Sequence, residues 1–262
     1  MELNREFLNK YDNLMAEDTE KALEFVLNAL NNTNNSDFYA YAADCYMTLG
    51  EFDKAIDMID NGLKNECRNK SFALSLKGET LFYMNEYIKS KEVFEMLYKD
   101  NPTSFFVIAY LMDIYINLKE YDKAIRIGEK ALSTKDLNNN DSAYISITIG
   151  WIKLKYLNDA DNAVIYFNDA LKLDDKSGRG YIGLGEYYFK KCDYKNALIN
   201  FDKAIDLDEG TISVYFNIAM CYKHLKMYEE AYEYLKIVCD AESDNSKYIY
   251  EKNEIKKLIN NI

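Results

Sequence analysis

The chain has 262 residues, a formal net charge of −12 at pH 7 and a hydrophobic content of 48%. The negative charge would repel the phosphates of a nucleic acid, and the longest apolar run, 105–112, is far shorter than the roughly 20 residues that a membrane helix needs. One proline and ten glycines leave little material for flexible linkers, which favours nearly continuous helix. We therefore expect a helical protein that binds neither nucleic acid nor a membrane.

The cysteine and histidine content argues against disulfides, zinc sites and catalysis. Five cysteines, an odd number, include no Cys-x-x-Cys pair, and the single histidine, His224, stands in an expected turn near two lysines. Acid–base and nucleophilic catalysis need an activated group held by a partner, most often a histidine. Residues 1–14 contain no apolar signal-peptide core. We expect a cytoplasmic protein with reduced thiols that is not an enzyme and uses neither a metal nor a cofactor.

Small residues recur at a nearly constant interval along the chain. They are Ala22, Ala55, Ser90, Ala124, Ala163, Ala197 and Ala231. The intervals between them are 33, 35, 34, 39, 34 and 34 residues. A fixed period in this range is typical of stacked helical repeats, in which each unit buries its apolar face only against its neighbours. The chain is therefore expected to be one continuous array.

Each small residue lies in the same local pattern of large and small side chains. In the second unit the pattern runs Tyr39, Ala43, Tyr46, Phe52 and Ala55, and similar runs return in the sixth and seventh units. Small residues allow neighbouring helices to approach closely, while aromatic rings fill the space beside the contact. Acidic residues open the second helix of several units, where a carboxylate complements the helix dipole. The pattern predicts a series of packed helix pairs.

These residues resemble the tetratricopeptide repeat, a unit of about 34 residues with a large residue at position 4, a small residue at position 8 and alanine at positions 20 and 27. The only proline, Pro102, stands at position 32 of the third unit, where the family favours a proline that ends the helix. The resemblance covers residues 3 to about 245. It implies an all-α fold, an α-solenoid that forms a right-handed superhelix of about seven helix-turn-helix units. In chain order the repeats would begin near Leu3, Ser36, Ser71, Phe105, Tyr144, Gly178 and Ile212.

Two repeats depart from the family pattern. The first is assigned by phase alone, since polar residues stand at its large and small positions. The fifth follows the interval of 39 residues, and we expect Gly150 rather than Trp151 at its small position. One extra residue would lie in the turn near Tyr156–Asp159. The others would lie in the Asn-rich loop Leu137–Asp141, where Asp141 would cap the next helix.

Residues 246–262 are expected to form a capping helix after the array of residues 1–245. Ile249, Ile255, Leu258 and Ile259 would cover the exposed edge of the seventh repeat, while the lysines between them face water. Terminal repeats need such a polar outer face. We expect a monomer, with weak self-association through the C-terminal repeat as the alternative.

The resemblance also implies where a ligand would bind. In this family the first helix of each repeat lines a concave groove through positions 2, 5, 9, 12 and 13. Carried over to this sequence, the groove candidates are Asp44, Phe72, Glu79, Phe82, Tyr83, Phe106, Asp113, Asn117, Arg179, Glu186 and Phe216.

Position 9 is acidic in four repeats, as Asp44, Glu79, Asp113 and Glu186, and the first three lie on consecutive repeats. A row of carboxylates in a partly desolvated channel favours a peptide with Lys or Arg and apolar side chains. The alternative is that position 9 is polar only because it faces water. We therefore predict a protein or peptide ligand that is basic and punctuated by apolar residues.

The family's two-carboxylate clamp for acidic peptide tails is not expected here, because Phe7 and Tyr11 stand where that clamp has Lys and Asn. The leading function is a scaffold or adaptor for protein interactions. One alternative is a peptide-sensing regulatory receptor, although repeats that start near residue 3 leave no room for the usual DNA-binding or effector domain. Another alternative is an accessory subunit of an enzyme complex.

Overall fold

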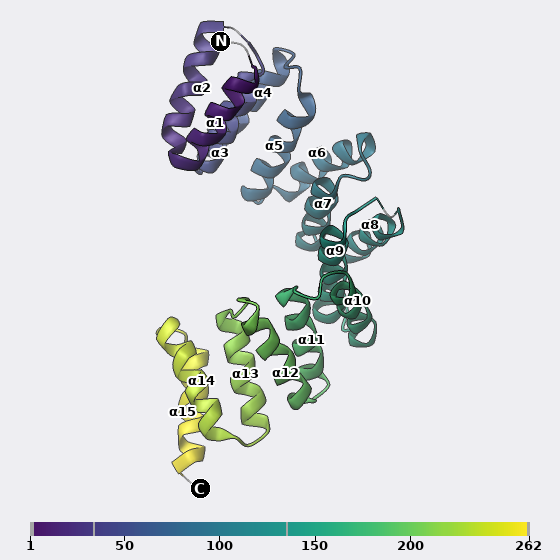
Figure 1. Cartoon of the computed structure of the whole chain (residues 1–262), viewed down its shortest axis with the longest axis vertical. Coiled ribbons are helices and arrows are strands. Elements are labelled where there is room, and N and C mark those ends of the chain that lie inside the picture. The colour runs from purple at the N-terminus through teal and green to yellow at the C-terminus, as the bar shows by residue number, and fades with distance from the viewer. Residues whose placement is uncertain (1–2, 34, 135, 261–262) are drawn as a thin grey trace. The chain divides into compact units, whose positions relative to one another are not determined.

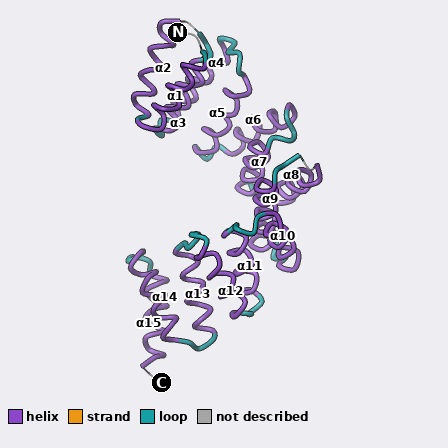
Figure 2. The backbone as a smooth tube through the Cα atoms, viewed as in Figure 1, coloured by secondary structure: helices purple, strands orange, loops and turns teal. Residues whose placement is uncertain are grey.

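The computed structural model describes residues 3–33, 35–134 and 136–260, and all regular structure in these residues is helical (Figure 2). The chain divides into two compact units, Met1–Ile127 and Gly128–Ile262, with the boundary inside helix α8. Unit 1 contains α1 (Arg5–Glu17), α2 (Thr19–Thr33), α3 (Phe38–Thr48), α4 (Phe52–Lys64), α5 (Lys70–Tyr83), α6 (Tyr87–Asp100), α7 (Phe105–Asn117) and the start of α8 (Tyr121–Thr134). Unit 2 contains the rest of α8, α9 (Asn139–Trp151), the π-helix η1 (Ile152–Tyr156), α10 (Ala160–Leu173), α11 (Gly178–Lys190), α12 (Tyr194–Asp206), α13 (Ile212–His224), α14 (Tyr228–Ala241) and α15 (Ser246–Asn260).

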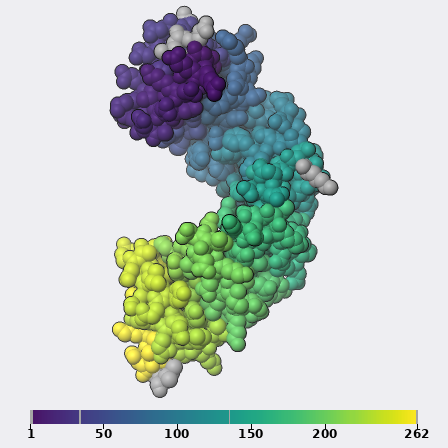
Figure 3. Space-filling model, viewed as in Figure 1, coloured from purple at the N-terminus to yellow at the C-terminus, as the bar shows by residue number. Residues whose placement is uncertain are grey.

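Within each unit, helices that are consecutive in the chain pack side by side (Figure 1). The buried residues form a series of local clusters, one of which joins α1, α2 and α3 and another α11, α12 and α13. Figure 3 shows one face of the molecule, on which residues that are close in sequence, and therefore in colour, lie close together. This arrangement confirms the predicted all-α repeat fold, because each helix pair buries its apolar side against the next pair.

All seven recurring small residues are fully buried, which confirms that they are packing positions. Ser90 replaces the usual alanine in the third repeat, and its hydroxyl donates a hydrogen bond of 2.7 Å to the carbonyl oxygen of Gly78. A Cβ atom on Gly78 would lie 2.6 Å from the ring of Phe94, and one on Gly185 would lie 2.5 Å from the ring of Phe201. The small residue at position 8 therefore makes room for the large residue at position 24.

The turns inside five of the seven helix pairs have the same backbone geometry. Gly50, Asn85, Lys119, Cys192 and Lys226 all lie in the left-handed region, with φ between 59° and 75°. The residue after each of them donates its backbone N–H to a carbonyl five residues earlier, as Glu51 does to Tyr46 at 2.8 Å. This is the Schellman ending of a helix, which satisfies carbonyl groups that would otherwise lack a partner.

The fifth repeat follows the prediction at its small position and differs from it at both ends. Gly150 is buried, and a Cβ atom there would lie 2.6 Å from the ring of Phe167, whereas Trp151 is only half-buried. The extra residue does not lengthen the turn but lies in the π-helix η1, which widens the end of the helix. There the backbone N–H of Leu157 donates to the carbonyl oxygen of Ile152. Insertions of one residue are commonly absorbed as such a π-bulge.

The start of the fifth repeat corrects a second prediction. Helix α9 begins at Asn139, and its N-cap is Asn138 rather than Asp141. The side-chain oxygen of Asn138 accepts the backbone N–H of Asp141 at 2.8 Å, and its amide donates to the Asp141 carboxylate at 2.9 Å. Asn138 thus caps the first turn of the helix by accepting a backbone N–H, and the Asp141 side chain in turn accepts a hydrogen bond from Asn138.

Helix α15 packs on α14 and closes the end of unit 2. Ile255 is fully buried and Ile259 packs against the same cluster, as predicted, but Leu258 is 37% exposed. Tyr248 adds a contact that was not predicted: its ring centroid lies 4.8 Å from that of Phe216. The helix is therefore held by an aromatic contact at its start and by isoleucines at its end.

Candidate peptide-binding face

Helix α3 carries Asp44 at the point where it meets the first repeat. The carboxylate is half-buried and accepts a hydrogen bond of 2.6 Å from the hydroxyl of Tyr11 on α1. Burial raises the pKa of Asp44, the hydrogen bond from Tyr11 opposes that shift, and the nearby charge of Asp12 adds to it. No lysine or arginine in the described part of the chain forms an ion pair with Asp44. The carboxylate is thus held by a neutral donor.

Glu79 on α5 repeats this arrangement. It is half-buried and accepts a hydrogen bond of 2.5 Å from the hydroxyl of Tyr110 on α7. Burial raises the pKa of Glu79, Tyr110 opposes the shift, and the charge of Asp44 adds to it. The effect of Asp44 on Glu79 indicates that consecutive carboxylates of the predicted row lie within electrostatic reach of each other.

The third acid of the row, Asp113, is half-buried on α7. The side-chain amide of Asn117, one turn later, donates to the backbone carbonyl of Asp113 at 2.9 Å and is exposed. Spacing of three or four residues places side chains on one face of a helix, so Tyr110, Asp113 and Asn117 share a face of α7.

The predicted aromatic residues of unit 1 lie beside these acids. The ring centroid of Tyr110 is 5.5 Å from that of Phe82 and 5.0 Å from that of Phe106. Tyr83 is 52% exposed and Phe106 is 38% exposed, so both present aromatic surface to solvent. Phe72 is half-buried against Tyr41 at 5.4 Å. We call the surface made by the following residues the acidic-aromatic face: Asp44, Phe72, Glu79, Phe82, Tyr83, Phe106, Asp113 and Asn117.

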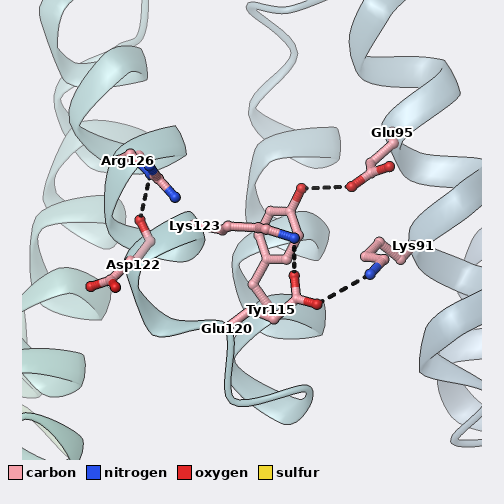
Figure 4. Close-up of polar contacts among 7 residues, drawn as sticks. All are labelled: Lys91, Glu95, Tyr115, Glu120, Asp122, Lys123 and Arg126. Atoms are coloured by element: carbon pink, nitrogen blue, oxygen red, sulfur yellow. Dashed lines mark hydrogen bonds and ion pairs between the residues drawn. The ribbon is translucent and has the colours of Figure 1, made fainter.

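Two other carboxylates of unit 1, Glu120 and Glu95, also accept hydrogen bonds from neighbouring side chains (Figure 4). Glu120 accepts hydrogen bonds from Lys91 at 3.2 Å and from Lys123 at 2.6 Å. The Lys123 ammonium holds the pKa of Glu120 below its ordinary value. Glu95 accepts the hydroxyl of Tyr115 at 2.9 Å. Unit 1 therefore contains both kinds of acid: Glu120 has lysine partners, whereas Glu95, like Asp44 and Glu79, accepts a tyrosine hydroxyl.

The candidates in unit 2 do not form an equivalent site. Glu186 on α11 lies 3.6 Å from the ammonium of Lys155, so its charge is compensated within the chain. The guanidinium of Arg179 lies over the ring of Tyr144 at 5.2 Å. Phe216 is only 8% exposed, because Tyr248 and the ammonium of Lys247 from α15 cover its ring. The prediction that Phe216 is open to a ligand is therefore wrong.

Comparison with known proteins supports the assignment of the repeats. A tetratricopeptide-repeat family model matches residues 143–177, 178–211 and 212–245. A tetratricopeptide repeat protein from Parabacteroides merdae superposes with a TM-score of 0.70 at 17% identity, covering 97% of each chain. Residues 143–245 are thus three tetratricopeptide repeats. Tetratricopeptide-repeat proteins generally act as scaffolds for protein interactions.

Two curated relatives show the same similarity in sequence. A TPR repeat-containing protein of Methanocaldococcus jannaschii is 25% identical over 264 residues, which cover 90% of this chain and 45% of that protein. Lipopolysaccharide assembly protein B of Escherichia coli is 20% identical over 240 residues, covering 89% of this chain and 61% of that protein. This tetratricopeptide-repeat protein thus spans roughly half of the length of these relatives.

The residues that hold the acidic row were not identified from the sequence of this tetratricopeptide-repeat protein. Tyr11 precedes Asp44 by 33 residues, and Tyr110 follows Glu79 by 31 residues. Both separations are close to one repeat, and first helices one repeat apart are neighbours in the stack. A search for tyrosines about one period from each acid would have found them.

Other features of this tetratricopeptide-repeat protein also bear on its function. The described part of the chain contains no cluster of three or more His, Cys, Asp or Glu side chains that could hold a metal ion. Within residues 3–33, 35–134 and 136–260, no helix is both long enough and apolar enough to cross a membrane. Four cysteines are buried, whereas Cys192 is exposed in its turn.

Proposed function

We propose that this tetratricopeptide-repeat protein is an interaction scaffold whose acidic-aromatic face binds a protein segment rich in basic and apolar side chains. The observation that carries the proposal is the state of Asp44 and Glu79. Each is a half-buried carboxylate without a lysine or arginine partner in the described residues, and each lies on a first helix close to aromatic side chains.

The electrostatics favour a cationic ligand. A carboxylate that has lost part of its hydration and gained only a neutral tyrosine donor keeps an uncompensated charge. A lysine or arginine of the ligand would supply the missing charge, and its approach would exclude more water and strengthen the interaction. The raised pKa values of Asp44 and Glu79 are consistent with such a site.

The aromatic surface favours apolar side chains in the same segment. Tyr83 and Phe106 are each partly exposed, and large exposed aromatic side chains commonly anchor protein interfaces. The acids and aromatics come from α3, α5 and α7, so contacts would be spread over three repeats. The scaffold would act by presenting a long surface that needs little rearrangement on binding.

Fluorescence polarisation with a labelled synthetic peptide of about 15 residues, carrying arginines and leucines at helical spacing, tests this proposal. We expect the wild-type chain to bind and the Asp44→Lys/Glu79→Lys/Asp113→Lys variant to lose binding. A matched control, Glu24→Lys/Asp57→Lys/Glu92→Lys, changes the net charge equally at exposed acids on the second helices α2, α4 and α6. Equal loss in both variants would show only non-specific attraction and would refute the proposal.

A further inference from the structure

One acid of the row has an environment that the others lack. Glu79, Phe82 and Tyr83 occupy positions i, i+3 and i+4 of α5, so their side chains share one face of that helix. Tyr110 of α7 joins them: its hydroxyl lies 2.5 Å from Oε1 of Glu79, and its ring centroid is 5.5 Å from that of Phe82. The ring of Tyr83 lies against that of Phe82 as well, so the four side chains form one cluster, in which burial and the bond to Glu79 raise the pKa of Tyr110.

The cluster has one unused acceptor and one open aromatic ring. Tyr110 engages Oε1 of Glu79, and no side chain in the described residues donates to Oε2. Tyr83 packs edge-on against Phe82 at 5.9 Å and stacks on Phe52 at 6.2 Å, yet it remains 52% exposed. The cluster thus combines a half-buried carboxylate that has a further acceptor oxygen with a tyrosine that is half exposed to solvent.

We propose that the cluster of Glu79, Phe82, Tyr83 and Tyr110 is an anchor site for a single arginine side chain of the bound segment. This inference rests on the proposed function, since it names the residue that the acidic-aromatic face recognises. The guanidinium would donate to Oε2 of Glu79 and lie against the ring of Tyr83, while Phe82 and Tyr110 form the wall beside it.

Arginine fits this site better than lysine for three physical reasons. A guanidinium is planar and stacks on an aromatic ring, whereas an ammonium is a compact point charge. The guanidinium is also more weakly hydrated, so it costs less to bring beside a half-buried carboxylate. Its donors are fixed in one plane, which lets it bond Oε2 while Tyr110 retains Oε1.

The corresponding positions in other repeats do not offer the same combination. The residue four positions after the acid is Thr48 for Asp44, Asn117 for Asp113 and Lys190 for Glu186. Only Glu79 is followed by an aromatic residue at that spacing, and Glu186 already has Lys155 at 3.6 Å. The anchor is thus confined to the third repeat.

Three versions of the same labelled peptide test the proposal, with one central position occupied by arginine, lysine or uncharged citrulline and no other charged residue. With the full chain we expect the arginine peptide to bind on the order of tenfold more tightly than the lysine peptide, and the citrulline peptide to bind most weakly. Glu79→Gln should abolish the difference between arginine and lysine. Tyr83→Ala should reduce it, and Tyr83→Phe should preserve it.

Glu95→Gln is the matched control, because Glu95 also accepts a tyrosine hydroxyl between neighbouring helices but lies away from the cluster. It should leave the preference for arginine intact. Equal affinity for the arginine and lysine peptides, with binding still lost in the triple Lys variant, would overturn the anchor and leave the proposed function standing. Failure of all three peptides and of the multiply charged peptide to bind would overturn both. A preference that survives Glu79→Gln would also overturn the anchor.

Discussion

Replacement of Gly78 with alanine would place a methyl group against a ring that supports the candidate site. The new Cβ atom would lie 2.6 Å from Cε2 and 2.9 Å from Cδ2 of Phe94, which is fully buried. Phe94 cannot retreat freely, because its ring stacks on Tyr110 at 4.8 Å with an interplanar angle of 7°. Since Tyr110 also donates to Glu79, the substitution should disturb both packing and the site.

The size of this effect follows from two opposing contributions. Overpacking a well-filled core costs about 1–3 kcal/mol, and alanine is favoured over glycine within a helix by about 1 kcal/mol. We expect the Gly78→Ala variant to be less stable by about 1 kcal/mol. Adding Phe94→Ile should recover most of the loss, because the second repeat already packs Ala43 and Ile59 in one buried cluster.

Urea unfolding followed by far-UV circular dichroism would measure the four members of this double-mutant cycle at one pH. The expected result is a coupling of about 1 kcal/mol between positions 78 and 94. Ser75→Ala on the same helix is the control, because it raises helix propensity without a clash. Additive effects of the two substitutions, or a Gly78→Ala variant as stable as Ser75→Ala, would refute the proposed fit between positions 8 and 24.

Three further predictions concern a turn, the site and the C-terminal helix. Lys226→Gly should raise stability by up to about 1 kcal/mol in thermal melts, because Lys226 has φ of 63°, where a side chain is disfavoured; an unchanged midpoint would contradict this. Peptide affinity should increase as pH rises through the raised pKa values of Asp44 and Glu79 and then level off, because a bound cation favours the charged carboxylates and binding releases protons. A profile that is equally steep in Asp44→Asn/Glu79→Gln would exclude these groups as its source. Ile255→Ala should cost about 2–4 kcal/mol locally and increase amide exchange in α15, whereas the exposed Leu258→Ala should change little.

The repeated pattern of large and small packing residues was predictable from the sequence, because it depends on local spacing. All seven small residues are buried as expected, and the glycine chosen for the fifth repeat is the one that faces Phe167. The form of the insertion in that repeat was not predictable, since one extra residue can widen a helix or lengthen a turn at similar cost. The contacts with neighbouring helices decided in favour of η1.

The candidate site was predicted in part. The sequence placed acids and aromatics on the first helices, and unit 1 brings Glu79, Phe82 and Phe106 together around Tyr110. The sequence also allowed two interpretations of the acids, as a row of carboxylates in a partly desolvated channel or as polar residues that face water. Asp44 and Glu79 are half-buried, and each accepts a tyrosine hydroxyl, a partner that neither interpretation included. The rotation of one repeat against the next determines which acid accepts a tyrosine hydroxyl and which forms an ion pair with a lysine.

The sequence by itself determined the family, the helix pairs and the positions of the small packing residues, because these follow from a period that each repeat satisfies through local contacts. Only the tertiary structure decided which groove candidates remain accessible. It covered Phe216 with α15, paired Glu186 with Lys155, and left Tyr83 exposed beside Glu79. The physical reason is that burial and charge compensation arise between side chains about one repeat apart or on the terminal helix, where the period alone does not specify orientation.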